Sequence, residues 1–155
     1  MIRHFYLILA PLVLLTLVAC SDSTTEPTFE GTFTAEVNGS TFTAIHAAGY
    51  EATEQFAVSG QNAAGASVGF SVILNPERVG TYTVGTQANG TYVEGTVGWT
   101  TAGGSGTFEI TSYTEDRVVG IFSFEAQPNT PSGATGTISV TNGRFDVPML
   151  QDQAQ

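Results

Sequence analysis

The sequence contains one cysteine, no lysine and few charged side chains. Cys20 is the only cysteine, so the chain cannot form an internal disulfide. Four arginines stand against fourteen aspartates and glutamates, which gives a net charge of −10 over 155 residues. Because phosphate binding depends on clustered Lys and Arg, this composition excludes nucleic acid as a partner.

The sequence also has few histidines and no helical pattern of apolar residues. His46 is the only histidine beyond the first nineteen residues, and no second histidine or further cysteine exists to complete a metal cage or a nucleophile pair. We therefore predict no metal site, no cofactor and no catalytic residue. The 18 glycines and the lack of a 3.6-residue apolar period argue against helices.

The first nineteen residues, "MIRHFYLILAPLVLLTLVA", have the pattern of a secretory signal peptide. A basic start at Arg3 precedes an apolar run that contains Pro11 and is shorter than the roughly 20 residues needed to cross a bilayer. The run ends in "LVAC", which resembles the lipobox of bacterial lipoproteins. This resemblance implies cleavage after residue 19 and attachment of a lipid to Cys20, with an ordinary secreted protein as the alternative.

Residues 20–28 predict a flexible tether between the lipid and a domain. The stretch "SDSTTEP" has no apolar period and no bulky residue, so it cannot pack. The lipid would hold the protein on a membrane of the bacterial cell envelope. Ser21 rather than Asp follows the cysteine, and by resemblance to the sorting pattern of enterobacterial lipoproteins this favours the outer membrane over the inner one.

A β-domain is predicted over residues 29–149, followed by a short tail at 150–155. From Phe29 to Val37 the odd positions are apolar or small and the even ones polar, which is the pattern of a half-buried strand. Similar segments rich in Val, Ile, Phe, Tyr and Thr cover residues 55–60, 66–74, 106–113 and 117–126. Nine or ten strands with short connections predict an all-β fold, either an antiparallel sandwich or a flattened up-and-down barrel.

Three Asn-Gly pairs predict hairpin turns, because both central residues of a type I′ turn need a positive φ. The pair at 38–39 would set Ala35 against Phe42 and Gly31 against His46, which places His46 on the buried face. The pair at 142–143 would set Val140 against Phe145.

The third Asn-Gly pair, at 89–90, would close a hairpin within residues 80–99. Its register sets Tyr82 against Val97 and Gly80 against Trp99. A sugar-stacking role for Trp99 with Tyr50, Tyr82 and Tyr92 is an alternative to a place in the core.

Four segments together resemble a known family. They are "FTAEVNGSTFTA", "GTYTVG", "GSGTFEITSYTEDRVVGIFSFEA" and "ISVTNGRFDVP". In order and spacing they resemble an uncharacterised family of lipid-anchored β-domain lipoproteins of Bacteroidetes-like bacteria. The resemblance runs from Phe29 to about Pro148 and implies the fold and the anchoring, but no activity.

The interior is predicted to be packed with rings. The phenylalanines expected to face inward are Phe33, Phe42, Phe56, Phe70, Phe108, Phe122, Phe124 and Phe145. Glycines at positions 31, 69, 95 and 120 argue the other way, because they remove side chains and would open space.

Three functions fit the sequence. The first is an envelope lipoprotein with a non-enzymatic β-domain that binds a protein or glycan partner or has a structural role. The second is a lipocalin-like carrier of an apolar ligand, which needs a cavity. The third is an acid/base hydrolase, which needs two of Glu94, Glu109 and Glu125 at about 5 to 10 Å across a cleft.

Overall fold

Ten strands make up the regular structure of the described residues, which are 31–52, 55–73, 78–102 and 104–150 of the computed structural model. The strands are β1 (Thr32–Val37), β2 (Ser40–Ala52), β3 (Gln55–Asn62), β4 (Ser67–Ile73), β5 (Gly80–Thr83), β6 (Ala88–Glu94), β7 (Val97–Thr100), β8 (Gly106–Tyr113), β9 (Arg117–Pro128) and β10 (Ile138–Leu150). Burial alternates along most of them, as the period of two in the sequence requires. The predicted all-β fold is confirmed, and no helix occurs in the ranges that the structure covers.

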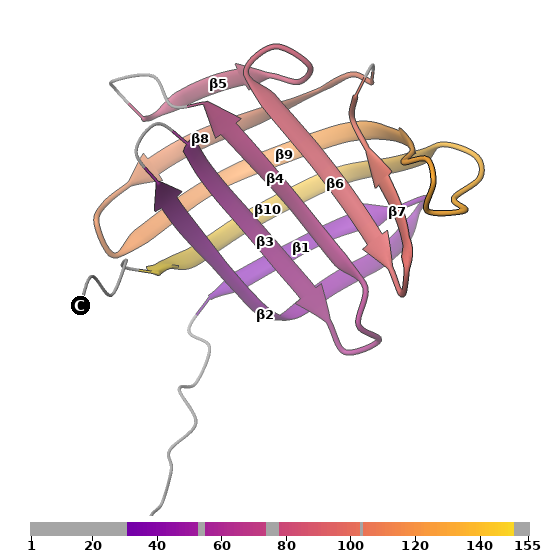
Figure 1. The fold of residues 1–155 in the computed structure, drawn as a ribbon. Coiled ribbons are helices and arrows are strands. Elements are labelled where there is room, and N and C mark those ends of the chain that lie inside the picture. The colour runs from indigo at the N-terminus through magenta and orange to yellow at the C-terminus, as the bar shows by residue number, and fades with distance from the viewer. Residues whose placement is uncertain (1–30, 53–54, 74–77, 103, 151–155) are drawn as a thin grey trace, which may run out of the picture.

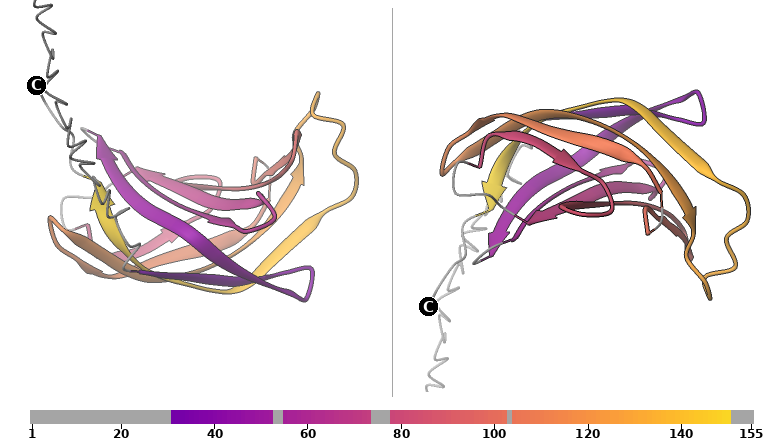
Figure 2. Two further views of the ribbon diagram at one scale, coloured as in Figure 1. Left: turned by 90° about the horizontal axis from the view of Figure 1, so that it is seen from below. Right: turned by 90° about the horizontal axis from the view of Figure 1, so that it is seen from above.

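The strands form two layers, as Figures 1 and 2 show. The front layer contains β2, β3, β4, β6 and β7, and the back layer contains β1, β10, β9, β8 and β5. Three short pairings join the layers. The start of β2 pairs with β1, Met149 and Leu150 run parallel to Gly49 and Tyr50, and the ends of β7 and β9 pair antiparallel. The single ten-stranded sheet is therefore a flattened barrel that can also be described as a sandwich.

The predicted hairpin at residues 38–39 is present. Asn38 and Gly39 have φ values of 49° and 79°, and Ala35 pairs with Phe42 as expected. The register changes at Ile45, an extra residue in β2 relative to β3. This bulge turns His46 to the exposed side, where it pairs with Gln61. The prediction of a buried His46 opposite Gly31 is wrong for this reason.

The other two predicted Asn-Gly turns are wrong. Residues 142–143 form a bulge within the continuous strand β10, and Val140 pairs with Phe124 of β9 instead of with Phe145. Residues 89–90 lie inside β6, and the hairpin turn lies farther on, between the paired residues Glu94 and Val97. In both cases the strand continues because a neighbouring strand pairs with it on each side.

The strand pairing predicted within residues 80–99 does not form either. Tyr82 pairs with Phe108 of β8, and Trp99 pairs with Tyr92 of β6. Strand β5 thus belongs to the back layer, and strand β7 belongs to the front layer.

Aromatic rings fill the space between the layers. All eight phenylalanines predicted to face inward are buried, each with at most 3% of its surface exposed. Phe70 of the front layer stacks on Phe108 of the back layer with ring centroids 4.3 Å apart, and its centroid is 5.1 Å from that of Phe145. These contacts join the two layers into one core.

Candidate functional site

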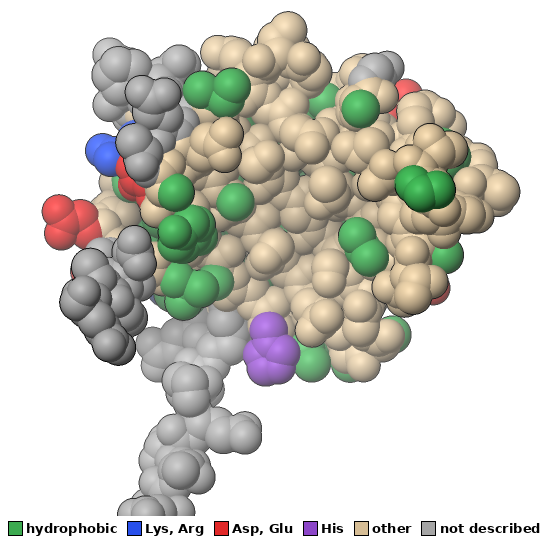
Figure 3. Space-filling model, in the orientation of Figure 1, with side chains coloured by type: hydrophobic (Ala, Val, Ile, Leu, Met, Phe, Trp, Pro, Cys, Tyr) green, Lys and Arg blue, Asp and Glu red, His purple; other side chains and the backbone are tan. Residues whose placement is uncertain are grey.

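The outward side of the front layer carries no carboxylate and no guanidinium group at any described position. Its side chains are small, hydroxyl-bearing, amide-bearing or aliphatic, with one histidine and one tyrosine. We call this surface the neutral face, and it consists of His46, Ala48, Tyr50, Ala52, Gln55, Ala57, Ser59, Gln61, Ser67, Gly69, Ser71, Ile73, Asn89, Thr91, Val93, Gly98 and Thr100. In Figure 3, which views this side, acidic and basic side chains lie at the rim.

Charged side chains instead occupy the outward side of the back layer. They are Glu36, Glu109, Arg117, Glu125, Arg144 and Asp146. Arg117 Nε lies 2.5 Å from Asp146 Oδ1 and forms an ion pair across β9 and β10. A chain with a net charge of −10 thus presents one outward sheet surface with ionic groups and one without them.

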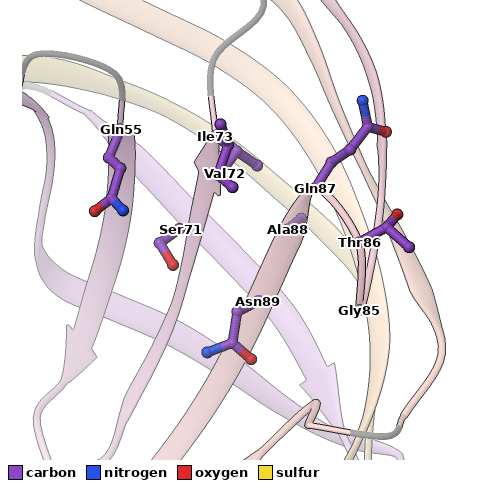
Figure 4. Close-up of a pocket in the computed structure, with 9 residues that line it drawn as sticks. All are labelled: Gln55, Ser71, Val72, Ile73, Gly85, Thr86, Gln87, Ala88 and Asn89. Carbon is purple, nitrogen blue, oxygen red and sulfur yellow. The ribbon is translucent and has the colours of Figure 1, made fainter.

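A cleft opens on the neutral face where β3, β4 and β6 lie side by side. It encloses about 280 Å³, and its lining includes Gln55, Ser71, Ile73 and Asn89. Ser71 pairs with Asn89, and Gln55 pairs with Ile73, so these side chains occupy adjacent rows of the sheet. Figure 4 shows Gln55, Ser71 and Asn89 projecting toward the same side of the sheet, whereas Gln87 at the rim points away from them.

A buried hydroxyl fixes the orientation of the Asn89 amide. Thr101 is fully buried, and its Oγ1 accepts a hydrogen bond of 2.9 Å from the Gly90 amide. Its own hydrogen is donated to Asn89 Oδ1 at 2.8 Å, and the Thr100 hydroxyl donates to the same oxygen at 3.1 Å. Because Oδ1 faces these hydroxyls, the Asn89 nitrogen turns to the side of Ser71, as Figure 4 shows. The cleft therefore contains a donor that is oriented before any ligand arrives.

Two other polar groups in the cleft are free to bind a ligand. Neither the Gln55 amide nor the Ser71 hydroxyl has a hydrogen-bond partner within the part of the chain that the structure describes. Ile73 beside them leaves 56% of its surface exposed and supplies an apolar patch. The cleft thus combines exposed amide and hydroxyl groups, which have no protein partner among the described residues, with one aliphatic surface, a combination suited to a small-molecule site.

A second polar cluster lies at the end of the barrel where β2 and β8 end. Arg78 Nε donates to Glu51 Oε1 at 3.1 Å, and the Tyr113 hydroxyl donates to Glu51 Oε2. The Arg78 guanidinium also lies 5.2 Å from the centroid of the Tyr113 ring. The cluster connects the segment before β5 to both layers, so it closes this end of the fold.

The hydrogen bonds of this cluster shift the pKa values of Glu51 and Tyr113. Partial burial alone would raise the pKa of Glu51, but the hydrogen bonds from Arg78 and Tyr113 outweigh it and lower that pKa below its usual value. Burial, together with the hydrogen bond to the Glu51 carboxylate, raises the pKa of Tyr113 to about 12. At neutral pH the cluster therefore holds an ionised Glu51 and a protonated Tyr113.

The three glutamates considered for a hydrolase do not come together. Glu109 of β8 lies opposite Ile121 of β9, and Glu125 is four residues farther along β9, which is roughly 13 Å away. Glu94 lies at the end of β6 in the front layer, where it accepts a hydrogen bond of 3.2 Å from the Tyr92 hydroxyl. Glu109 also lines a cleft of about 260 Å³ on the back layer, near Arg144.

The aromatic residues considered for sugar stacking divide between the core and the surface. Tyr82 is fully buried and Tyr92 is 8% exposed. Trp99 packs against the core with its ring centroid 5.5 Å from that of Tyr92, and its Nε1 donates to the Gly136 carbonyl at 3.0 Å. Tyr50 alone of the four points outward, with 44% of its surface exposed on the neutral face.

Several predicted features lie outside the described residues. They are the signal peptide at 1–19, Cys20 with the tether at 20–28, and residues 151–155 of the tail. Within the ranges that are described, no helix is long and apolar enough to cross a membrane. The same ranges contain no group of three or more His, Cys, Asp and Glu side chains close enough to hold a metal ion.

A protein-family comparison matches residues 26–148 to a family described as a domain of unknown function (DUF6252). The chain belongs to this family. The prediction of an uncharacterised family is thereby confirmed, over nearly the span that the sequence resemblance covered. No curated protein and no solved structure matched the chain in the other two comparisons.

The cleft residues were not among the candidates from the sequence. Gln55, Ser71 and Asn89 are separated by sixteen or more residues along the chain and become neighbours only through the register of β3, β4 and β6. The Asn-Gly pattern predicts a turn at Asn89 instead. The available signal was the uncharged outward half of each of these strands, which has meaning only after the strands are placed side by side.

Proposed function

We propose that this protein is a lipoprotein of the bacterial cell envelope whose β-domain is a non-enzymatic binding module. In this proposal the signal peptide is removed, Cys20 carries the lipid, and residues 20–28 link the lipid to the domain. The outer membrane is its destination, since Ser21 and not Asp follows the cysteine.

The cleft on the neutral face is the observation that carries the binding role. A hydrogen-bond donor fixed by a fully buried threonine lies next to two exposed polar groups that have no partner within the described residues, so the cleft presents pre-oriented and accessible hydrogen-bonding groups to a ligand. The surface around it has no ionic groups within the described strands, so a ligand meets hydroxyl, amide and aliphatic groups. Such a surface favours recognition over acid/base chemistry.

The two alternatives receive less support. A carrier of an apolar ligand needs an open interior, and aromatic rings occupy the space between the layers. A hydrolase needs two carboxylates across one cleft, and Glu109 and Glu125 are separated by four residues along the sheet.

Replacement of Cys20 tests the anchoring. The full-length protein is expressed in an enterobacterial host with a labelled fatty acid. The wild-type protein should take up the label and fractionate with membranes, and Cys20→Ser should do neither. Ser21→Ala is the matched control, because it changes the neighbouring residue and keeps the thiol. Equal labelling of Cys20→Ser and the wild type would overturn the proposed anchoring.

The destination and the binding role need separate measurements. Ser21→Asp should move the protein from the outer to the inner membrane in a host that uses the aspartate sorting rule. If the wild type and this variant fractionate identically, the proposed outer-membrane location is wrong for that host. The binding role is tested with the cleft variants described next.

A further inference from the structure

We propose that the cleft on the neutral face binds an uncharged saccharide. This inference rests on the proposed function of the domain as a binding module and assigns its ligand class. It follows from the charge, the hydrogen-bonding groups and the apolar surfaces of the cleft.

The charge distribution selects a neutral ligand. A phosphorylated or sulfated ligand would require arginine or lysine, and the described part of the neutral face has neither. A cationic ligand would require carboxylates, which lie on the outward side of the back layer instead. An ionic ligand would therefore lose its hydration in the cleft without gaining a counter-charge.

The hydrogen-bonding groups select a ligand with hydroxyls. The Asn89 nitrogen is a donor whose direction is set by Thr101, whereas Gln55 and Ser71 can both donate and accept. Sugar hydroxyls both donate and accept, so they can satisfy all three groups. A purely apolar ligand would leave these groups without partners, at a cost comparable to a lost hydrogen bond for each.

The apolar surfaces suit the C–H face of a sugar ring. Ile73 is exposed beside Gln55 in the cleft. Tyr50 is exposed in the same cross-strand row as Ser71 and Asn89, through the pairings of Ala57. Tyr50 and Ser71 lie two strands apart, about 10 Å, so a ligand longer than one sugar ring would reach both the cleft and the tyrosine ring. The site is thus expected to prefer an oligosaccharide to a monosaccharide.

A set of trisaccharides tests the ligand class. Maltotriose, cellotriose, mannotriose and N-acetylated chitotriose are titrated into the full-length protein in detergent, with the acidic trigalacturonate for comparison. At least one neutral sugar should bind with a dissociation constant below about 1 mM, and trigalacturonate should bind more weakly. Failure of all four neutral sugars to bind, or preference for trigalacturonate, would overturn the saccharide assignment. Neither result would alter the labelling of Cys20, which tests the anchoring separately.

Isosteric variants test the location of the site. Asn89→Asp keeps the oxygen that accepts from Thr100 and Thr101, but replaces the fixed donor with a charged acceptor, and Gln55→Glu makes the same kind of change on β3. Each should weaken the binding of the neutral sugar at least about tenfold. Gln61→Glu, at an exposed amide six residues from Gln55 toward the other end of β3, is the matched control and should leave the affinity unchanged. If all three variants bind the sugar as tightly as the wild type does, the sugar does not bind in this cleft.

Light scattering in the same detergent separates a saccharide from a second protein copy. If the wild type is a dimer that Asn89→Asp and Gln55→Glu dissociate, the neutral face holds another copy of the chain, and the saccharide assignment is wrong. An unchanged oligomeric state together with the loss of sugar binding in these variants supports it.

Discussion

The ring of Phe145 occupies the place of a side chain at Gly120, its direct cross-strand partner. A Cβ built on Gly120 would lie 2.4 Å from Phe145 Cζ and 2.2 Å from the Glu109 carbonyl oxygen. The same relationship recurs at Gly143, which lies beneath the ring of Phe122 on the partner strand. Inward glycines of β9 and β10 therefore make room for rings and leave no open space at these positions. Of the glycines that the sequence suggested would open space, Gly120 is covered by a ring, Gly69 faces outward and Gly95 lies in the turn between β6 and β7, so none of these three opens the interior.

Gly120→Ala should destabilise the domain by about 1 to 3 kcal/mol. The added methyl would press on a backbone carbonyl that is fixed by the pairing of β8 and β9, so the strain cannot be relieved by a side-chain rotation alone. Denaturation in urea measures the free energy of unfolding. Gly98→Ala is the matched control on β7, where the nearest atoms to a new Cβ are 3.9 Å away, and a loss as large as that of Gly120→Ala would contradict this account.

His46→Ala should change the free energy of unfolding by less than about 0.5 kcal/mol. The bulge at Ile45 leaves His46 exposed, so no core contact is lost. Phe42→Ala, four residues earlier on the buried face of β2, should cost about 3 to 5 kcal/mol. Thermal unfolding of both variants gives the comparison, and a comparable drop in Tm for His46→Ala would mean that the bulge does not form.

The strands could be predicted from the sequence because buried and exposed residues alternate along each strand, and this alternation is visible in a short stretch of sequence. The alternation from Phe33 to Val37 is visible in five letters, and all eight inward phenylalanines follow from such alternations. The turns were harder, because Asn-Gly permits a positive φ without requiring a reversal. Asn142 does have a φ of 53°, but β10 pairs with β1 and β9 at the same time, and the chain continues through a bulge. Pairing with strands that are distant in the sequence therefore decides whether an Asn-Gly pair forms a hairpin turn or a bulge within a continuous strand.

The cleft could not be predicted because its register depends on the pairing order of the strands. The sequence pattern predicts that residues 79–85 pair with residues 91–99, which would place Asn89 at a hairpin tip. In the structure β6 pairs with β4, so that Asn89 lies beside Ser71, and the buried Thr101 reaches it from the segment after β7. A one-residue shift in either pairing would reverse the faces of these side chains.

Glu51→Gln should lower the stability by about 1 kcal/mol at pH 7, with a smaller loss in acid. The folded protein holds the pKa of Glu51 below the usual value of 4.5, so its contribution is present above pH 4.5 and is lost as the pH falls through the folded value. The difference between wild type and variant, measured in urea at pH 7 and pH 3, should therefore shrink at the lower pH. A difference that is equal at both pH values would mean that the carboxylate of Glu51 contributes nothing through its ionised form.

Tyr113→Phe probes the same cluster from the alkaline side. Because the folded protein raises the pKa of Tyr113 to about 12 from a usual value of 10, the contribution of the protonated hydroxyl is complete below pH 10 and is lost between pH 10 and pH 12. The pKa of Tyr92 is raised as well, so the comparison is made between wild type and variant and not with an unfolded reference. Titrated side by side and followed by the absorbance of phenolate, the two proteins should differ by one hydroxyl that ionises near pH 12. The variant keeps the ring of residue 113 that contacts Phe56, at 5.7 Å between centroids in the wild type.

The interior should bind no large apolar ligand, because rings from both layers meet in its centre. Phe70 contacts Phe108 and Phe145 across the layers, and the glycine at position 120 is covered by the last of these rings. A ligand-carrying barrel keeps a cavity of some 300 Å³ or more, which here would require several of these rings to leave the core. A form of the protein that starts at Phe29 should therefore neither enhance the fluorescence of a hydrophobic probe nor carry lipid through purification. Phe70→Ala removes the ring at the centre of these contacts, so the folded variant should enhance the fluorescence of the probe. Circular dichroism gives the unfolded fraction of the variant, and the probe fluorescence of that fraction is subtracted. Stoichiometric lipid on the unaltered form would instead establish that the rings move apart in solution and that the domain is a carrier.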